Sequence, residues 1–258
     1  MKDNVTKLPV KGNRQRKPMS KKMRMRRRRQ MLMRRMVSLI IFTIVLFGGG
    51  YFIFTAADPG AKMDVPLVCQ LPELQNGCEI TSLTMLLNYK GVDRDKISLA
   101  EEMKKDETQL QRDSNGLIKI WGNPKNGFVG DVTGYEGIGY SVDPDPLIPL
   151  INKYYDGGAV NLTGGSIKDI KQNLKEGNPV VAWVTSDFGR VKEYEMWKDS
   201  SNNEVQASFK VHAVLLTGYD DTYFYYNDPL NNKKDEIVRL NYFESVWNDM
   251  GKKALTMK

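Results

Sequence analysis

The sequence predicts one folded domain built from both helices and strands, preceded by a membrane-spanning helix. Three observations support this. The run 36–57 is uncharged and about as long as a bilayer core requires. A helical pattern of apolar residues begins directly after Cys78, and a pattern typical of an apolar β-hairpin covers 211–227. With 258 residues, of which 41% are hydrophobic, the chain can bury one good core.

The basic residues are concentrated at the N-terminus. Residues 1–35 contain fifteen Lys or Arg and one acid, a charge of +14, and because the whole chain carries +7 the remainder carries −7. A nucleic-acid-binding arm would need aromatic side chains for base stacking, and this segment has none. We therefore expect no nucleic-acid partner, and interpret 1–35 as a cytoplasmic tail that orients a membrane helix.

The run 36–57 is predicted to be an uncleaved signal-anchor helix. A cleavable signal peptide is the alternative, since Thr55 and Ala57 suit a cleavage site, but its apolar region would exceed the usual length of about 7 to 15 residues. The positive-inside rule places the chain after Asp58 outside the cell. The predicted organisation is therefore a tail (1–35), an anchor (36–57), a linker (58–63) and an extracellular domain (64–258).

Cys78 is predicted to stand at the start of a helix. Asn76 and Gly77 favour a loop before it, and an apolar helical pattern continues to Tyr89. The unpaired N–H groups and the macrodipole at such a position favour a thiolate. Buried core packing is the alternative for a cysteine beside an apolar helix.

The following elements are expected in chain order from helix caps, apolar runs and turn residues. They are a helix from Ser98 to about Lys105, a glycine-rich irregular excursion over 109–149, a helix over 146–155, a strand over 159–162, a helix over 166–174 capped by Ser166, a strand over 180–184, and an exposed polar insertion around 192–206. The excursion is interpreted either as a wall of a substrate cleft or as packing over the core.

A hairpin of 211–217 and 222–227 carries His212, the single histidine of the chain. If the turn is 219–221, Gly218 faces Thr222 and His212 faces Asp228. Directly opposed side chains share a face with Cβ atoms roughly 5 Å apart, close enough for an imidazole–carboxylate hydrogen bond. A structural histidine and a turn-forming aspartate are the alternatives. Together with Cys78, however, the pair supplies a nucleophile, a base and an orienting acid.

Two cysteines and one histidine are too few for a structural zinc site, which takes four such ligands. We expect no metal and no cofactor. Cys69 lies in an apolar run and is interpreted as a small core residue, although an oxidising compartment would permit a Cys69–Cys78 disulfide.

These residues resemble the papain-like cysteine peptidases, and more narrowly the bacteriocin-processing, double-glycine type in its stand-alone branch. The matching segments cover about residues 64–230, and are VPLVCQLPELQNGCEITSLTMLLNY, NPKNGFVGDVTG, NPVVAWV and HAVLLTGYDDTYFYYNDP. The order of the cysteine, the strand histidine and the later Asp-Pro carries the resemblance.

The resemblance implies an α+β, papain-like fold in which the cysteine-bearing helix packs on an antiparallel sheet. It implies Cys78 as nucleophile, His212 as general base, Asp228 as orienting residue and Gln70 as oxyanion-hole side chain, acting on a peptide or protein. Gln70 lies eight positions before the cysteine, farther than is common in the family, and Gln75 is its rival. The transporter-fused relatives cut leader peptides after paired glycines, but this chain has no nucleotide-binding motif, so that substrate is not expected here.

Two other classes stay open on the sequence. A papain-like peptidoglycan hydrolase would use the same nucleophile, although such enzymes commonly use a second histidine. A membrane-anchored binding module would keep the cleft without the chemistry. The oligomeric state is not determined by any pattern in the sequence.

Overall fold

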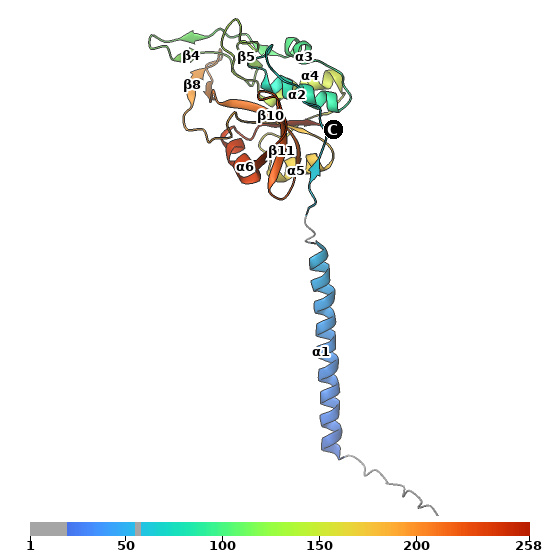
Figure 1. Cartoon of the computed structure of the whole chain (residues 1–258). Helices are drawn as coiled ribbons and strands as arrows, with labels where there is room; N and C mark the ends of the chain where they lie inside the picture. Colours follow the sequence, from blue (N-terminus) through green and yellow to red (C-terminus); the bar gives the residue numbers. More distant parts are fainter. Residues whose placement is uncertain (1–19, 55–57) are drawn as a thin grey trace, which may run out of the picture. The chain divides into compact units, whose positions relative to one another are not determined.

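The structure is a computed structural model that describes residues 20–54 and 58–258, with the side chains of 45–54 left undescribed. The chain forms two compact units, Met1–Ala57 and Asp58–Lys258, and each is described by itself. Figure 1 shows the course of the chain through both units.

The first unit contains the helix α1 (Lys21–Phe54). Within the described residues, no helix combines the length and the apolar character that a membrane crossing requires. The predicted anchor 36–57 lies partly outside the described residues, and most of the predicted tail, 1–19, lies outside them as well.

The second unit is built on a seven-stranded sheet with the order β12-β11-β10-β7-β13-β6, in which β1 also pairs with β10. Every pairing in this sheet is antiparallel. Its strands are β1 (Ala61–Lys62), β6 (Ala159–Asn161), β7 (Val180–Thr185), β10 (Val211–Tyr219), β11 (Tyr223–Asp228), β12 (Lys233–Arg239) and β13 (Ala254–Met257).

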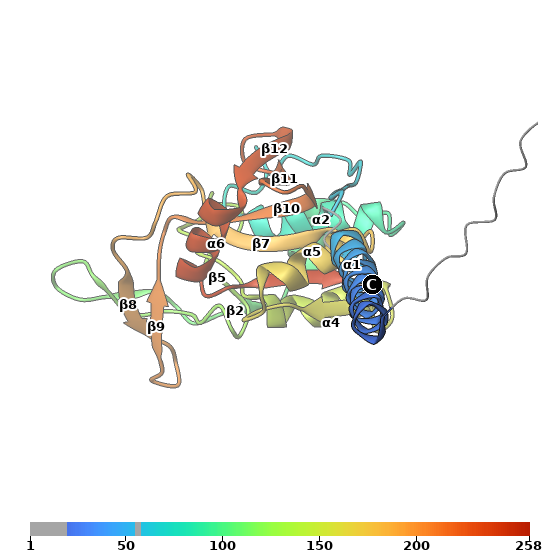
Figure 2. The same cartoon turned by 90° about the horizontal axis from the view of Figure 1, so that it is seen from below.

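Helices cover both faces of this sheet. In Figures 1 and 2, α2 (Cys78–Tyr89) and α4 (Pro144–Tyr154) lie on one face, and α5 (Ile167–Lys175) and α6 (Leu240–Asp249) lie on the other. A short helix, α3 (Lys96–Glu102), follows α2. The predicted α+β arrangement, in which the cysteine-bearing helix packs on an antiparallel sheet, is confirmed.

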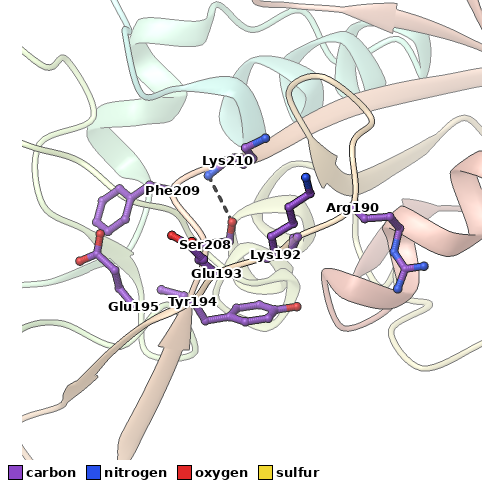
Figure 3. Close-up of a pocket in the computed structure, with 10 residues that line it drawn as sticks. Arg190, Lys192, Glu193, Tyr194, Glu195, Ser208, Phe209 and Lys210 are labelled. Atoms are coloured by element: carbon purple, nitrogen blue, oxygen red, sulfur yellow. Dashed lines mark hydrogen bonds between the residues drawn. The ribbon is translucent and has the colours of Figure 1, made fainter.

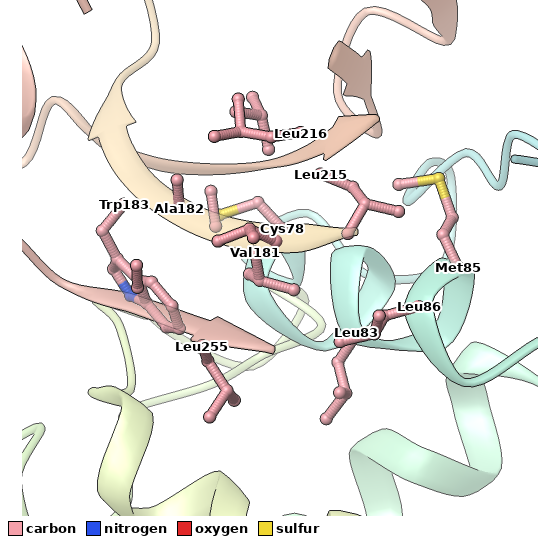
Figure 4. Packing of buried hydrophobic residues seen from close by; sticks show 14 of the residues in the cluster. Cys78, Leu83, Met85, Leu86, Val181, Ala182, Trp183, Leu215, Leu216 and Leu255 are labelled. Carbon is pink, nitrogen blue, oxygen red and sulfur yellow. The ribbon is translucent and has the colours of Figure 1, made fainter. Parts of the chain in front are cut away.

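The core between α2 and the sheet is formed by buried apolar side chains that pack against one another. Figure 4 shows Leu83 and Leu86 of α2 against Val181 of β7 and Leu215 of β10. These four side chains are fully buried. Because burying one such side chain contributes about 1.5 to 3 kcal/mol, this packing fixes α2 on the sheet and with it the position of Cys78.

Smaller strands form two further sheets beside the main one. The parallel pair β2 (Lys105–Asp106) and β5 (Phe128–Val129) makes one, and the order β3-β4-β8-β9 makes the other. The strands of the latter are β3 (Gln111–Arg112), β4 (Ile118–Ile120), β8 (Glu195–Lys198) and β9 (Glu204–Ala207). The β8–β9 hairpin lies apart from the seven-stranded sheet in both views (Figures 1 and 2).

Three expectations about organisation are wrong in part. The predicted linker 58–63 contains β1, because Ala61 and Lys62 pair with Tyr219 and Gly218. The polar insertion 192–206 contains β8 and most of β9, and its alternation buries Trp197 and Val205 in a second apolar cluster. The excursion 109–149 likewise contributes Trp121 and Val129 to that cluster, so it is partly core.

The remaining elements agree closely with their predictions, because their signals are local. Ser166 caps α5, and its side chain and that of Asp169 form a reciprocal capping box. The strand predicted over 180–184 is β7, and the hairpin predicted over 211–227 is formed by β10 and β11. The structure starts α3 two residues earlier than predicted, at Lys96, because the side chain of Asp95 caps the helix by accepting from the backbone N–H groups of Ile97 and Ser98.

Candidate active site

Cys78 is the first residue of α2, as predicted. The turn before it is braced from outside, since the backbone N–H of Asn76 donates to Val132 O and its side-chain amide donates to Asp131 O. Gly77 is required at the next position, because a Cβ there would lie 2.5 Å from the Cβ of Leu74. The Asn-Gly pair therefore fixes the loop that delivers Cys78 to the helix start.

The helix that carries Cys78 is tied directly to the strand that carries His212. The hydroxyl of Ser82, one turn after Cys78, donates to the backbone oxygen of Ala213 at 3.2 Å. Ala213 is the next residue after His212 on β10. Cys78 and His212 thus belong to two elements that are held together near the site.

His212 and Asp228 form the predicted contact. The imidazole Nε2 lies 2.9 Å from Asp228 Oδ1, and both side chains are buried. Because Nε2 is engaged by the carboxylate, Nδ1 is the ring atom that remains for a nucleophile. An acid in this position orients the ring and stabilises the imidazolium.

The register that produces the contact differs from the predicted one. The prediction placed opposed residues at a sum of 440, whereas Leu215 pairs with Asn227 and Leu216 with Tyr226, a sum of 442. The turn is shifted, with Asp220 accepting from Thr222 N and Tyr223 N, and a bulge lies between Leu216 and Gly218. A shift of two keeps the same face, so Asp228 meets His212 as a diagonal neighbour rather than a directly opposed one.

Asp228 is held as a carboxylate. Burial acts to raise its pKa, but the hydrogen bond and charge of His212 and the backbone N–H groups of Asn231 and Leu230 outweigh burial, and the pKa is lowered. Those two N–H groups donate to Oδ1 at 3.2 and 2.8 Å, and the Asn231 side-chain amide donates to Oδ2 at 2.9 Å. The lowered pKa favours the ionised form of Asp228 in the folded protein.

Gln70 is buried beside the same strand end, whereas its rival Gln75 is exposed. The backbone N–H of Gln70 donates to the oxygen of Pro229, next to Asp228. Its side-chain Nε2 donates to Gln75 O at 2.9 Å, in the loop before Cys78. One N–H of the amide remains for an oxyanion, and the Cys78 N–H belongs to the first turn of α2, which has no partner within the helix.

Lys96 braces the segment that carries Gln70, a role that no sequence signal indicated. Its ammonium group donates to Cys69 O at 2.6 Å and to Gln70 O at 3.0 Å. The same group forms an ion pair with Glu73 at 2.6 Å. Three contacts from one side chain hold both ends of the Cys69–Glu73 turn.

The thiol of Cys78 does not have the environment that the sequence predicts. Its Sγ donates to Glu79 Oε2 at 3.2 Å, and the hydrogen bonds of the described residues include none between this thiol and His212. Burial, followed by the charge and hydrogen bond of Glu79, raises the thiol pKa well above its ordinary value, against a smaller lowering by the backbone of Ala213 and Glu79. The expected low pKa is wrong for this arrangement, because burial beside an acid outweighs the helix start.

Glu79 is the site residue that sequence reasoning missed. It is buried, and besides the thiol it accepts a hydrogen bond at 2.5 Å from the hydroxyl of Ser141, which is also buried. Its pattern signal is weak, because an acid in the first turn of a helix is ordinary. Cys69 is free and partly exposed, so no disulfide consumes Cys78.

A pocket of about 510 Å³ lies beside the start of β10. Figure 3 shows Tyr194, Phe209 and Lys210 among its lining side chains, and Lys210 precedes His212 by two residues. Neither Cys78 nor His212 lines it, because both are buried, with 8% and 2% of their surface exposed. Cys78 and His212 are thus buried, and this surface pocket does not include them.

Two of the comparisons with known proteins name the same family. The model of the Peptidase_C39 like family matches residues 62–255. The uncharacterized protein YvpB of Bacillus subtilis (strain 168) is 38% identical over 198 residues, covering 76% of this chain and 75% of YvpB. A crystal structure from Bacillus anthracis, assigned to the C39-like peptidases, is 37% identical with a TM-score of 0.70, covering 78% of this chain and 98% of that one.

A more distant solved structure is that of Xylellain, a cysteine protease from Xylella fastidiosa. It is 16% identical with a TM-score of 0.40, and covers 79% of this chain and 87% of that chain. Similarity at this level carries no weight for the site.

Proposed function

The chain belongs to the Peptidase_C39 like family, as the resemblance to papain-like cysteine peptidases predicted, and we propose that it hydrolyses peptide bonds through Cys78, His212 and Asp228. The single observation that supports this most strongly is the 2.9 Å contact between His212 Nε2 and Asp228 Oδ1. It leaves Nδ1 for the thiol, on a strand tied to the cysteine-bearing helix.

The first half of the proposed reaction transfers the acyl part of the substrate to Cys78. His212 takes the thiol proton, and the Cys78 sulfur attacks the substrate carbonyl carbon to form a tetrahedral oxyanion. The Gln70 amide and the Cys78 N–H donate to that oxyanion. The imidazolium returns the proton to the leaving amine, and a thioester between Cys78 and the acyl part remains.

Water completes the cycle. His212 accepts a proton from the water as it attacks the thioester. When the second tetrahedral intermediate breaks down to the acid, the imidazolium returns that proton to the leaving sulfur, and the Cys78 thiol is regenerated. Asp228, an ionised acid with its oxygens bonded to Asn231 and Leu230, keeps the ring in place through both steps.

The test is a hydrolysis assay on a mixture of unstructured peptides with the full-length protein in detergent. We expect cleavage by the wild type, and none by Cys78→Ser with the same circular dichroism spectrum. Cleavage by Cys78→Ser would overturn the proposed nucleophile. A parallel digestion of purified cell wall separates a peptide substrate from a peptidoglycan cross-link.

We also propose that 36–57 anchors the peptidase domain at the outer face of the cell membrane. The proposal rests on the +14 charge of 1–35 and on the uncharged run that follows. In intact cells, added protease should degrade the part after Asp58 and spare an epitope at residue 10. Protection of the C-terminal domain would contradict the proposal.

A further inference from the structure

Glu79 is a buried acid that the proposed reaction does not use. It is 1% exposed, and acids are almost never buried to this degree unless they are paired. Among the residues that the structure describes, no lysine or arginine forms an ion pair with it. Its two hydrogen bonds are to the thiol of the nucleophile and to the hydroxyl of Ser141.

A purely structural role for this acid is a poor explanation of its position. An acid in the first turn favours a helix through the macrodipole, but an exposed side chain supplies that benefit as well. Asp145, the second residue of α4 as Glu79 is of α2, does so from the surface. Burial of Glu79 against the thiol therefore needs a reason connected with the thiol.

The titratable groups around Glu79 come from three elements. Cys78 lies on its own helix, and His212 faces it from β10, where the imidazole charge acts to lower the pKa of Glu79. Tyr140, next to Ser141, belongs to the segment 139–142, and its pKa is raised by burial, then by the charge of Asp143 and, less, by the charge of Glu79. Burial prevails at Glu79 itself, so its pKa is raised despite the Ser141 hydrogen bond.

We propose that Glu79 is a positioning residue that holds the Cys78 thiol as a protonated hydrogen-bond donor in the resting protein, so that the sulfur becomes a nucleophile only after this bond is released. This inference rests on the proposed peptidase reaction. The thiol and His212 share no hydrogen bond at rest, whereas the thiol and Glu79 do. On release, the thiol proton passes to the imidazole and a thiolate–imidazolium pair forms.

Glu79→Gln is the sharpest test, because glutamine keeps the size of the side chain. Its carbonyl still accepts from Ser141, but its amide carries no charge and donates to sulfur rather than accepting from it. The measurement is the iodoacetamide alkylation rate of Cys78 against pH in a Cys69→Ser background, without any substrate.

We expect Glu79→Gln to alkylate at least about tenfold faster at pH 7, with the midpoint of the pH profile moved down, since one pKa unit corresponds to a tenfold change in thiolate fraction. Asp145→Asn, the matched loss of an acid at the same helix position, should leave the rate and the midpoint unchanged. An unchanged or slower rate in folded Glu79→Gln would overturn the proposal.

If Glu79→Gln does not fold, Ser141→Ala decides. This variant removes the 2.5 Å donor that fixes Glu79 Oε1, so Glu79 ionises less readily and alkylation should accelerate several-fold. No acceleration would overturn the proposal.

The outcome separates this inference from the proposed function, because alkylation needs no turnover. Faster alkylation of Glu79→Gln in a protein that cleaves no peptide would overturn the peptidase assignment alone. Peptide cleavage by the wild type with no acceleration in Glu79→Gln would overturn the role of Glu79 alone.

Discussion

Two acids of the site, Asp228 and Glu79, are almost equally buried, yet their pKa values move in opposite directions. Asp228 is 2% exposed and its pKa is lowered, whereas Glu79 is 1% exposed and its pKa is raised. The difference lies in the depth of each acid beneath the surface, which is greater for Glu79, and in the donors. Asp228 accepts from two backbone N–H groups, an amide and an imidazole, while Glu79 accepts from a hydroxyl and a thiol. Burial alone therefore does not determine the charge of an acid here.

The same comparison divides the site into two halves. The half on β10 and β11 already has the arrangement that the proposed reaction requires, because His212 contacts an acid whose pKa is lowered. The half at the start of α2 lacks such an arrangement, because burial and Glu79 raise the pKa of the Cys78 thiol. The two halves should respond differently to substitution.

The largest effect should follow from His212→Ala, which removes the only imidazole. We expect turnover to fall by about 100-fold to 10,000-fold, the usual contribution of general-base catalysis, with the fold retained. Initial rates of peptide hydrolysis measure this. If His212→Ala kept wild-type turnover, the half of the site on β10 and β11 would have no part in the reaction.

Gln70→Ala should come next. Removing one oxyanion donor usually costs about 100-fold to 1,000-fold in kcat. Gln75→Ala is the matched control, because that side chain is exposed, and it should change kcat little. Equal losses in the two variants, or a larger loss in Gln75→Ala, would reassign the oxyanion role.

Asp228→Ala should reduce kcat less than His212→Ala does. In other triads the loss on removing the orienting acid is roughly 100-fold smaller than the loss on removing the base, and we expect the same here. Asp228→Asn should retain more activity than Asp228→Ala, because an amide oxygen still accepts from the imidazole. A loss in Asp228→Asn as large as that in His212→Ala would mean that the negative charge, not orientation, is the essential contribution.

The smallest effects are on stability, and their signs should differ between the two acids. A lowered folded-state pKa stabilises the protein above the unfolded pKa, so Asp228→Asn should lower Tm at pH 7, with the deficit vanishing as the pH falls through the folded pKa. A raised folded-state pKa destabilises the ionised form, so Glu79→Gln should raise Tm at pH 7. That gain should disappear below the ordinary glutamate pKa of about 4.3. Calorimetric scans from about pH 2 to pH 7 measure both, and shifts of the same sign at pH 7 would contradict the comparison.

Much of the fold was predictable because its signals are local. The helix start at Cys78 follows from Asn76 and Gly77, and the cap at Ser166 follows from its own side chain and Asp169. The His212–Asp228 contact was predictable because the two residues lie on the same face of the sheet in the predicted register and in the observed one. The displaced turn and the bulge after Leu216 together shift the pairing by two residues from the predicted register, and an even shift preserves the face.

The rest depended on tertiary contacts that the sequence does not display. The β8–β9 hairpin looks polar because only its alternate residues, such as Trp197 and Val205, are buried. The thiol pKa depended on how deeply Cys78 is buried and on Glu79, an acid that accepts a hydrogen bond from Ser141, 62 positions later in the chain. The prediction of a low thiol pKa from the position of Cys78 at a helix start took account of neither the burial nor the neighbouring acid.

The central claim is that Cys78 is a nucleophile activated by His212, and labelling with a peptide carrying a thiol-reactive electrophile tests it most directly. The full-length protein is treated at pH 7, and the modified residue is identified by mass spectrometry. We predict a single label, on Cys78 and not on Cys69. With each rate divided by that of a free thiol, the peptide reagent should label Cys78 faster than iodoacetamide does. In His212→Ala the peptide labelling should be at least about 100-fold slower. Equal labelling of both cysteines, or labelling of Cys78 at an unchanged rate in His212→Ala, would contradict the claim.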